Sequence, residues 1–321
     1  MIHPIPPGTR DVLPDEMREL RAISESLRDT FEAGGYGEVW TPAVEYEEVL
    51  RAGDENAANA GYRMFDEQGR VLALRSDMTI PIARLVATRF GDVSPLRLSY
   101  FGHAYRSVEH TSGQQREFLQ GGIELIDVPG AAGEVEVIAT TLAGLAAVGL
   151  ARHRLGLGDG ALYRTLLDAL DVPADSQPGL LTCLATRDLV TLEMRVSELG
   201  LASDARDTLV RLPELRGGPE VLDRANGLAN DAVDGLRVLY AALEEEGVAN
   251  QVILDLGLVR ELSYYTGAVY EVYDPAVGFS LGGGGRYDDL IGRFGAPRPA
   301  CGLTLDLQRV HVAQAAEEGL R

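Results

Sequence analysis

The chain has 321 residues and a formal net charge of −20 at pH 7. Hydrophobic residues make up 45% of it and charged residues 24%, which is typical of a soluble globular protein with an ample core. Because nucleic acids are held mainly by arginine and lysine contacts to phosphate, so acidic a chain is a poor candidate for binding tRNA or DNA.

The basic residues are all arginines, because the sequence contains no lysine. This excludes a P-loop lysine and a lysine Schiff base, and with them Walker-type nucleotide hydrolysis and pyridoxal chemistry. The two cysteines, Cys183 and Cys301, lie far apart and show no metal-ligand spacing, so we expect neither a disulfide framework nor a metal site. No cofactor is indicated.

The N-terminal residues have neither the basic region nor the apolar core of a secretion signal. No stretch approaches the roughly 18 uninterrupted apolar residues of a membrane span. We therefore expect a cytoplasmic protein.

In chain order, helical spacing of apolar residues predicts a helix from Pro14 that ends before Gly34. A short strand over 36–45, interrupted by proline, and a second strand over 71–75 follow. Ser76 or Asp77 then caps a helix that begins near Ile80. Capping is the common role of such residues, so Asp77 and Thr79 have a structural explanation beside any functional one.

A hairpin is predicted from a strand over 98–105, a turn through Thr111, Ser112 and Gly113, and a strand over 118–125. The second strand alternates polar and apolar residues with period two. The hairpin is either an ordinary amphipathic one, with its polar face in water, or part of a binding site.

The binding interpretation depends on Gln120 and Glu124, which project from one face of that strand. The intervening glycines, 121 and 122, would leave room for a ligand there. Arg106 ends the preceding strand and would face the same cleft. One cation and one anion in a shared cleft suit a zwitterion such as an amino acid.

The remaining segments predict a helix over 134–150, leucine-rich helices over 158–246, strands over 252–256 and 263–273, and a final strand leading into a helix after Cys301. Gly282 to Gly285 would let the backbone approach a ligand before a helix near Tyr287, or would form a flexible turn. The expected fold is α+β: an antiparallel sheet flanked by helices, formed by residues 1–157 and 247–321, with an inserted helical subdomain at 158–246.

Five segments resemble motifs of the catalytic core of histidyl-tRNA synthetase, a class II aminoacyl-tRNA synthetase. Thr41–Glu45 is similar to the dimer-interface motif 1, and Leu74–Thr79 is similar to the loop that contacts the histidine amino group. Arg106–Glu124 is similar to motif 2. Leu258–Gly267 is similar to the histidine-specific signature, and Gly283–Asp288 to its glycine-rich companion. The likeness runs from the proline-rich start to Arg309, and five motifs in the right order make a specific signal.

The resemblance implies a bound L-histidine. Its amino group would be held by Asp77 and Thr79, its carboxylate by Arg106 and Gln120, and its imidazole by Glu124 with Tyr264 and Tyr265. Arg260 matches the arginine that assists adenylate formation in the synthetases. Arg106 and Arg309 would be the remains of a nucleotide site.

Departures from the synthetase pattern concern ATP and tRNA. Val108, Gln114, Asp306 and Gln308 replace residues that the resemblance assigns to motifs 2 and 3, and we expect no anticodon-binding domain. This combination is similar to the regulatory subunits of ATP phosphoribosyltransferase, a family of synthetase paralogues. It implies a non-catalytic protein that binds histidine and confers activation and feedback inhibition on the short catalytic subunit in histidine biosynthesis. It also implies a motif 1 homodimer within a hetero-oligomer.

Two other interpretations differ in class. A free-standing enzyme could activate histidine with ATP, since Arg106, Arg260 and Arg309 suit a triphosphate. Arginines also persist where they bind carboxylates or form interface salt bridges, so they do not decide the matter. A tRNA-binding accessory protein is disfavoured by the charge.

Overall fold

The structure, a computed structural model, describes residues 5–54, 61–107, 115–225, 230–260 and 262–320. Its centre is a nine-stranded sheet in the order β1-β5-β6-β12-β11-β10-β7-β9-β8. The strands are β1 (Gly37–Glu38), β5 (Leu96–Tyr105), β6 (Glu117–Ile126), β7 (Arg154–Asp159), β8 (Arg216–Gly217), β9 (Val252–Asp255), β10 (Ala268–Tyr273), β11 (Ser280–Arg286) and β12 (Ala300–Asp306). All neighbours are antiparallel except β1 with β5 and β7 with β9, which confirms the predicted α+β class.

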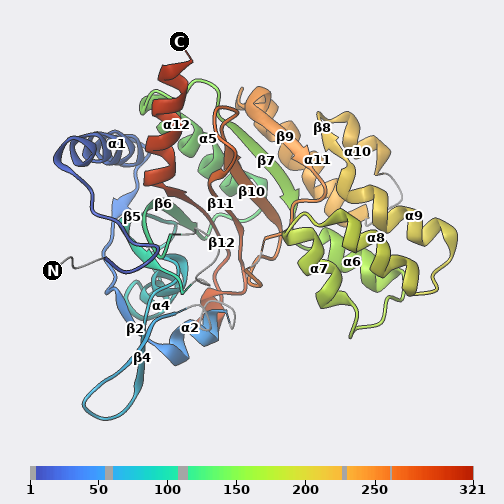
Figure 1. The fold of residues 1–321 in the computed structure, drawn as a ribbon, viewed down its shortest axis with the longest axis horizontal. Helices are drawn as coiled ribbons and strands as arrows, with labels where there is room; N and C mark the ends of the chain where they lie inside the picture. Colours follow the sequence, from blue (N-terminus) through green and yellow to red (C-terminus); the bar gives the residue numbers. More distant parts are fainter. Residues whose placement is uncertain (1–4, 55–60, 108–114, 226–229, 261, 321) are drawn as a thin grey trace.

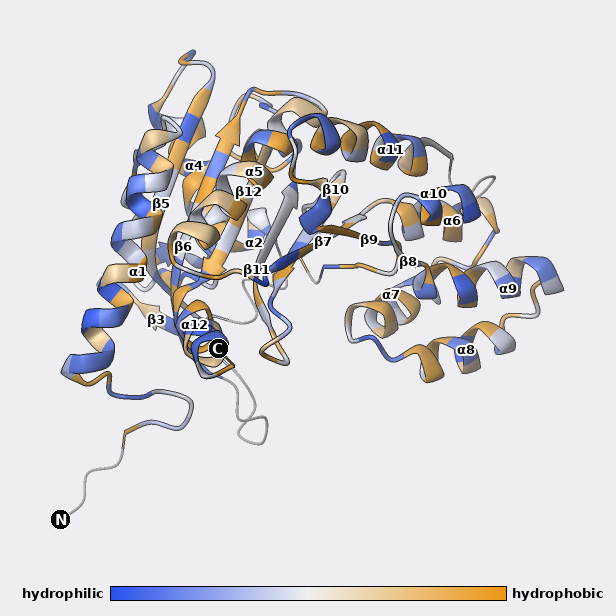
Figure 2. Ribbon diagram, turned by 90° about the horizontal axis from the view of Figure 1, so that it is seen from above, coloured by the Kyte–Doolittle hydropathy of each residue, from blue (hydrophilic) through white to orange (hydrophobic). Residues whose placement is uncertain are grey.

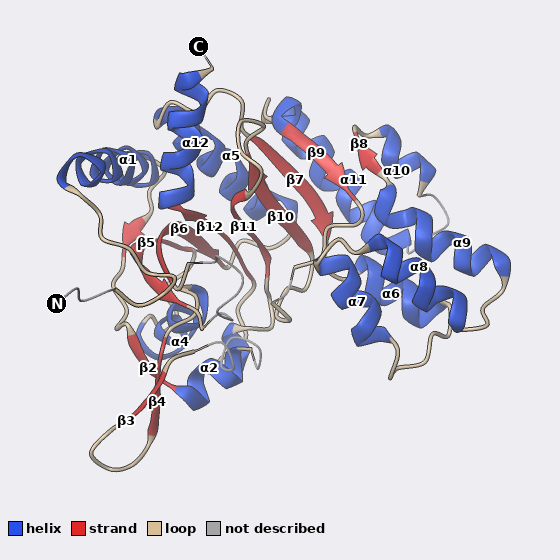
Figure 3. Ribbon diagram, viewed as in Figure 1, coloured by secondary structure: helices blue, strands red, loops and turns tan. Residues whose placement is uncertain are grey.

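Four helices pack on the large sheet: α1 (Pro14–Ala33), α5 (Ala131–Ala147), α11 (Asn230–Glu245) and α12 (Leu307–Gly319). A second group of helices gathers beside β8 and β9, on the right of Figures 1 and 3. It consists of α6 (Leu162–Ala169), α7 (Gln177–Ala185), α8 (Leu189–Glu198), α9 (Ser203–Arg211) and α10 (Glu220–Arg224). This group falls within the region expected to be an inserted subdomain. Short 3-10 turns lie at Leu212–Glu214, Ala249–Gln251 and Ile291–Arg293.

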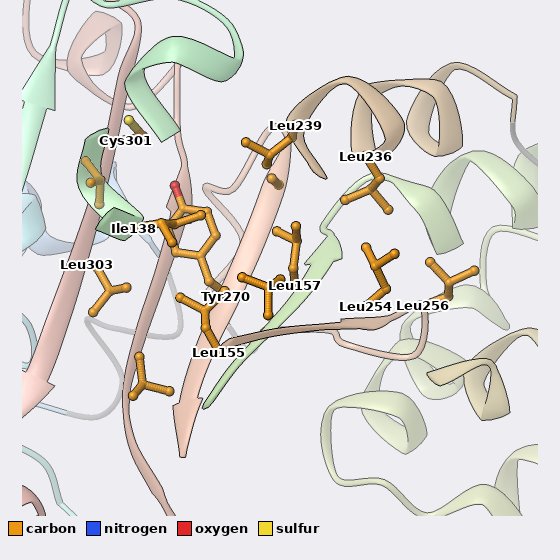
Figure 4. Close-up of a cluster of buried hydrophobic side chains, with 14 of the residues drawn as sticks. Ile138, Leu155, Leu157, Leu236, Leu239, Leu254, Leu256, Tyr270, Cys301 and Leu303 are labelled. Atoms are coloured by element: carbon orange, nitrogen blue, oxygen red, sulfur yellow. The ribbon is translucent and has the colours of Figure 1, made fainter. Parts of the chain in front are cut away.

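One face of the large sheet is an apolar core. Leu155 and Leu157 on β7 alternate in register with Tyr270 on β10 and Leu303 on β12, and α5 and α11 cover them (Figure 4). Ordinary period-two patterning therefore directs the other residues of these strands to the opposite face. Hydropathy alternates along α1 and α11 as expected for helices that cover a sheet (Figure 2).

A small sheet, in the order β2-β4-β3, stands beside α2 (Glu47–Gly53) and α4 (Thr79–Arg89). Its strands are β2 (Val44–Tyr46), β3 (Arg63–Phe65) and β4 (Val71–Leu74). Arg75, only 4% exposed, joins it to the large sheet by donating to the carbonyl oxygens of Thr41 at 2.7 Å and His103 at 2.8 Å. This arginine fixes the start of the loop that carries Asp77.

The predicted hairpin is confirmed by β5 and β6, which pair Leu98 with Glu124 and Gly102 with Gln120. Its predicted turn residues lie outside the described part of the chain. The first predicted helix is confirmed as α1, whose C-terminal residue is Ala33.

For Gly282 to Gly285 the predicted flexible turn and the predicted helix near Tyr287 are wrong, whereas Gly282 and Gly283 do line the cavity described below. These glycines form the interior of β11, and no α-helix begins near Tyr287 among the described residues. They are needed because β10 and β12 flank them closely: a Cβ on Gly284 would lie 2.7 Å from Leu303 Cα. The strand predicted over 263–273 begins only at Ala268, and the one predicted over 36–45 is divided between β1 and β2.

Candidate functional site

A cavity of about 470 Å³ opens on the sheet face opposite the apolar core. Its walls come from β6, β10, β11 and β12, from the loop before α4, from the segment before β10, and from Ala185 at the end of α7. Eight of the residues predicted from the sequence line it: Asp77, Thr79, Arg106, Gln120, Arg260, Tyr264, Tyr265 and Arg309. The fold thus gathers residues that are more than 200 positions apart in the chain.

One end of the cavity, formed by Ser76, Asp77 and Gln120, is here called the acceptor end. Ser76 Oγ, Asp77 Oδ2 and Gln120 Oε1 are buried, and none has a hydrogen-bond partner in the described structure. Buried polar atoms are normally paired, so these three atoms are available to pair with a ligand. Asp77 and Gln120 supply the acceptors that an ammonium group requires.

The structure confirms that Asp77 caps the first turn of α4, and its role in binding a ligand stays a prediction. Its Oδ1 accepts a hydrogen bond from Ile80 N at 2.9 Å in the first turn of α4, and its Oδ2 is left for a ligand. Burial raises the pKa of this carboxyl group, while the Ile80 amide and the Arg106 charge oppose that rise. A bound cation would favour the ionised carboxylate further.

Arg106 provides the positive charge near the acceptor end. Its Nε donates to Ser76 O at 3.2 Å, and its guanidinium carbon lies 5.5 Å from the centre of the Phe118 ring. Within the described part of the chain its two terminal nitrogens have no partner. They suit a carboxylate bound in the bidentate manner that arginine favours.

Glu124 does not line the cavity, although it shares a strand face with Gln120. It is 1% exposed and accepts hydrogen bonds from Thr79 Oγ1 at 2.8 Å and from the Tyr287 hydroxyl. Burial raises its pKa to about 7, although both hydrogen bonds lower it. Glu124 therefore reaches the cavity through Thr79, which does line it.

The tyrosines form a packed group under this wall. The ring centres of Tyr264 and Tyr265 are 4.8 Å apart, and Tyr264 meets Tyr287 edge-on at 5.9 Å. Sequence reasoning quoted Tyr287 only within the glycine-rich motif and missed its contact with Glu124. No local signal could have revealed it, because the two residues are 163 positions apart.

The glycines of β6 do not serve the ligand, contrary to the sequence interpretation. A Cβ on Gly121 would lie 2.7 Å from the Phe101 ring, and one on Gly122 would lie 2.5 Å from the Tyr100 hydroxyl. Neither glycine lines the cavity. They allow β6 to pack against the large aromatic residues of β5.

A second group of lining residues, here called the arginine end, consists of Arg260, Glu271, Asp306 and Arg309; Asp306 on β12 lies beside Gln120 on β6 in the register of the sheet. Arg260 lies 4.0 Å from Glu271, and Arg309 Nε lies 3.4 Å from Asp306 Oδ2. Arg309 also donates to Ser280 O at 2.9 Å. Sequence reasoning missed Glu271, although it points away from the core on the strand where Tyr270 points into it.

Among the described residues no cluster of three or more histidine, cysteine, aspartate and glutamate side chains could hold a metal ion. The helices in the described ranges are all too short or too polar to cross a membrane. The motif 2 departures at Val108 and Gln114 lie outside these ranges.

Known proteins are similar to this chain in sequence and in fold. A family model described as histidyl-tRNA synthetase matches residues 8–310. An ATP phosphoribosyltransferase regulatory subunit from Desulforamulus reducens is 42% identical over 320 residues, which cover 98% of this chain and 79% of that protein. The protein of the same name from Moorella thermoacetica is 41% identical over 317 residues, which cover 97% of this chain and 82% of that one.

Two solved structures agree. One, named as an ATP phosphoribosyltransferase regulatory subunit/histidyl-tRNA synthetase from Bacillus halodurans, is 33% identical with a TM-score of 0.90, over 98% of this chain and 84% of that one. The other, a histidine–tRNA ligase subunit from Alicyclobacillus acidocaldarius, is 32% identical with a TM-score of 0.88, over 99% of both chains. The chain therefore belongs to the histidyl-tRNA synthetase-like family of ATP phosphoribosyltransferase regulatory subunits.

Proposed function

We propose that this protein is a non-catalytic regulatory subunit that binds L-histidine and confers activation and feedback inhibition on the short-form catalytic subunit of ATP phosphoribosyltransferase. The observation that carries the proposal is the acceptor end, where buried oxygens without partners among the described residues lie near the Arg106 guanidinium. That arrangement complements the zwitterionic part of a free amino acid. The names of the relatives at 42% and 41% identity support the partner.

In the proposed complex Asp77 and Thr79 bind the amino group, and Arg106 binds the carboxylate. Gln120 offers both a donor and an acceptor beside them. Glu124, Tyr264 and Tyr265 fix the imidazole end, and Glu124 accepts an imidazole N–H in exchange for a hydrogen bond from Thr79 or Tyr287. Arg260 completes the set, and no residue is assigned a catalytic role.

Feedback requires that histidine favour one state of the assembly over another. Couplings of this kind are typically about 1–3 kcal/mol, a fivefold to 150-fold change in affinity. We propose that the assembly contains a homodimer formed through the motif 1 region. Trp40 and Phe65, which are 84% and 74% exposed, support an interface near the small sheet.

The first experiment measures phosphoribosyl-ATP formation by the short catalytic subunit from the same source, with and without this protein, across an L-histidine titration. We expect activity to rise on addition and to be suppressed by histidine. Glu124→Ala should remove the suppression and keep the activation. Unchanged inhibition by histidine in that variant would contradict the site assignment.

A free-standing histidine-adenylating enzyme is the alternative, favoured by the presence of Arg106, Arg260 and Arg309 in one cavity. It is tested by histidine-dependent exchange of pyrophosphate into ATP. Exchange by this protein alone, together with no effect on the catalytic subunit, would support the enzyme over the regulator.

A further inference from the structure

The cavity lining carries equal numbers of opposite charges. Three arginines, Arg106, Arg260 and Arg309, face three carboxylates, Asp77, Glu271 and Asp306. At the arginine end both cations are already paired, since Arg260 lies 4.0 Å from Glu271 and Arg309 lies 3.4 Å from Asp306. Of the described lining residues, only the acceptor end and Arg106 are left to bind charged groups of a ligand.

Asp306 occupies a position where an anionic ligand would otherwise be stabilised. It is the last residue of β12 and the N-cap of α12, where its Oδ1 accepts from Gln308 N at 3.1 Å and Arg309 N at 3.2 Å. Helix N-termini and arginine forks are the two protein features that most commonly bind phosphate. Here the Asp306 carboxylate already binds both the N-terminus of α12 and Arg309.

Burial and hydrogen bonding act in opposite directions on the Asp306 carboxyl group. Burial raises its pKa, and the Arg309 amide, the Arg309 guanidinium, the Gln308 amide and the Arg106 charge limit that rise. A phosphate group entering this end would meet an anion that is 8% exposed and held at three points. It would have to displace that carboxylate or lie beside a like charge.

We propose that Asp306 is a specificity-determining residue that makes the cavity reject polyphosphates, including nucleoside triphosphates, while the other end accepts a free amino acid. The proposal rests on the proposed function in treating the same cavity as the amino-acid site. It explains how a cavity with three arginines can discriminate against a triphosphate: two of the three already lie within 4.0 Å of a carboxylate of the chain.

The test compares the full-length protein with Asp306→Asn, using ATP and inorganic triphosphate as probes in equilibrium dialysis. Asparagine is as good an N-cap as aspartate, so the variant keeps the α12 cap and removes only the charge. We expect the variant to bind both probes at least roughly tenfold more tightly than the wild type, a change of about 1.4 kcal/mol. A gain for ATP alone would contradict phosphate rejection as the mechanism.

The matched control is Asp223→Asn, which changes the net charge equally. Asp223 pairs with Arg237 at 2.9 Å on the surface, outside the cavity. Equal probe binding by wild type and Asp306→Asn, whether weak or tight, would overturn the proposal, and so would an equal gain in the control. L-histidine binding is measured on the same proteins: its absence would refute the proposed function, while the probe comparison would still test Asp306.

Discussion

The two ends of the cavity contain similar residue types but differ in what those residues already bind. At the acceptor end, Asp77 uses one carboxylate oxygen for a helix cap, and the other has no partner among the described residues. At the arginine end, the carboxylate of Asp306 binds two amides and Arg309. Unsatisfied buried groups cost free energy until a ligand pairs them, whereas satisfied groups gain little from one. L-histidine binding should therefore be sensitive to substitutions at the acceptor end and should tolerate substitutions at the arginine end.

The largest expected effect concerns the buried carboxyl group of Glu124, which lies behind the cavity wall. Gly302 on β12 lies opposite Glu124 on β6, and a Cβ at this position would overlap the Glu124 carboxylate and lie 2.7 Å from Ile123 O. Gly302→Ala should lower the free energy of unfolding by about 4 kcal/mol through overpacking and the loss of hydrogen bonds to a buried carboxyl group. Denaturant unfolding measures the change.

Gly235→Ala is the control for that substitution. Gly235 lies on α11, where an added Cβ has no neighbour within 4 Å among the described residues. Alanine there should stabilise the protein by up to about 1 kcal/mol through helix propensity. If Gly302→Ala were equally harmless, Glu124 would not be held as rigidly as we describe.

The buried Glu124 also predicts a pH dependence of stability. Its pKa is about 7 in the folded protein, against 4.5 for an ordinary glutamate, so the folded state binds the proton more tightly than the unfolded chain does. Its contribution is fully present below pH 4.5 and is lost as the pH rises through 7, a total of about 3 kcal/mol. Between about pH 5 and pH 8 the free energy of unfolding should fall more steeply for the wild type than for Glu124→Gln. Parallel slopes would show that Glu124 titrates normally.

Asp77→Asn tests the charge at the acceptor end. Asparagine can still accept from Ile80 N, so the cap remains while the ligand's ammonium group loses its carboxylate. We expect L-histidine binding to weaken by about 2 kcal/mol, or roughly thirtyfold in calorimetry. Asp66→Asn is the control, because Asp66 accepts from backbone amides of Gln68 and Arg70 outside the cavity. A similar loss in both variants would indicate a general charge effect.

The spacing of apolar residues in the sequence predicted those helices and strands that pack a single apolar face against the core. The helix α1 and the hairpin β5–β6 are confirmed because each packs one face against the core and alternates accordingly. The run Gly282 to Gly285 has no side chains and therefore no periodicity. Only the contacts with β10 and β12 identify it as a strand, and those partners are distant in the sequence.

Part of the candidate site could also be predicted from the alternation of residues along a strand. Alternation places Gln120 and Glu124 on one face of β6, but it does not give the depth of each side chain. Depth is set by Tyr287, which arrives from the far end of the chain and encloses Glu124. Pairing of Arg309 with Asp306 is a short-range contact, yet the sequence does not reveal that both line the cavity that contains Asp77.

The smallest expected effect on L-histidine affinity is that of Arg309→Gln at the arginine end. Arg106→Gln, near the acceptor end, is the matched variant. Arg309 is bound to Ser280 O and Asp306, so its replacement should change L-histidine affinity by less than about threefold. The terminal nitrogens of Arg106 have no partner among the described residues, and losing a charge-assisted bond to the ligand carboxylate should cost about 2 kcal/mol. Calorimetry on both variants decides the comparison. Equal losses would mean that the ligand's carboxylate reaches both arginines, and that the ion pair with Asp306 opens when histidine binds.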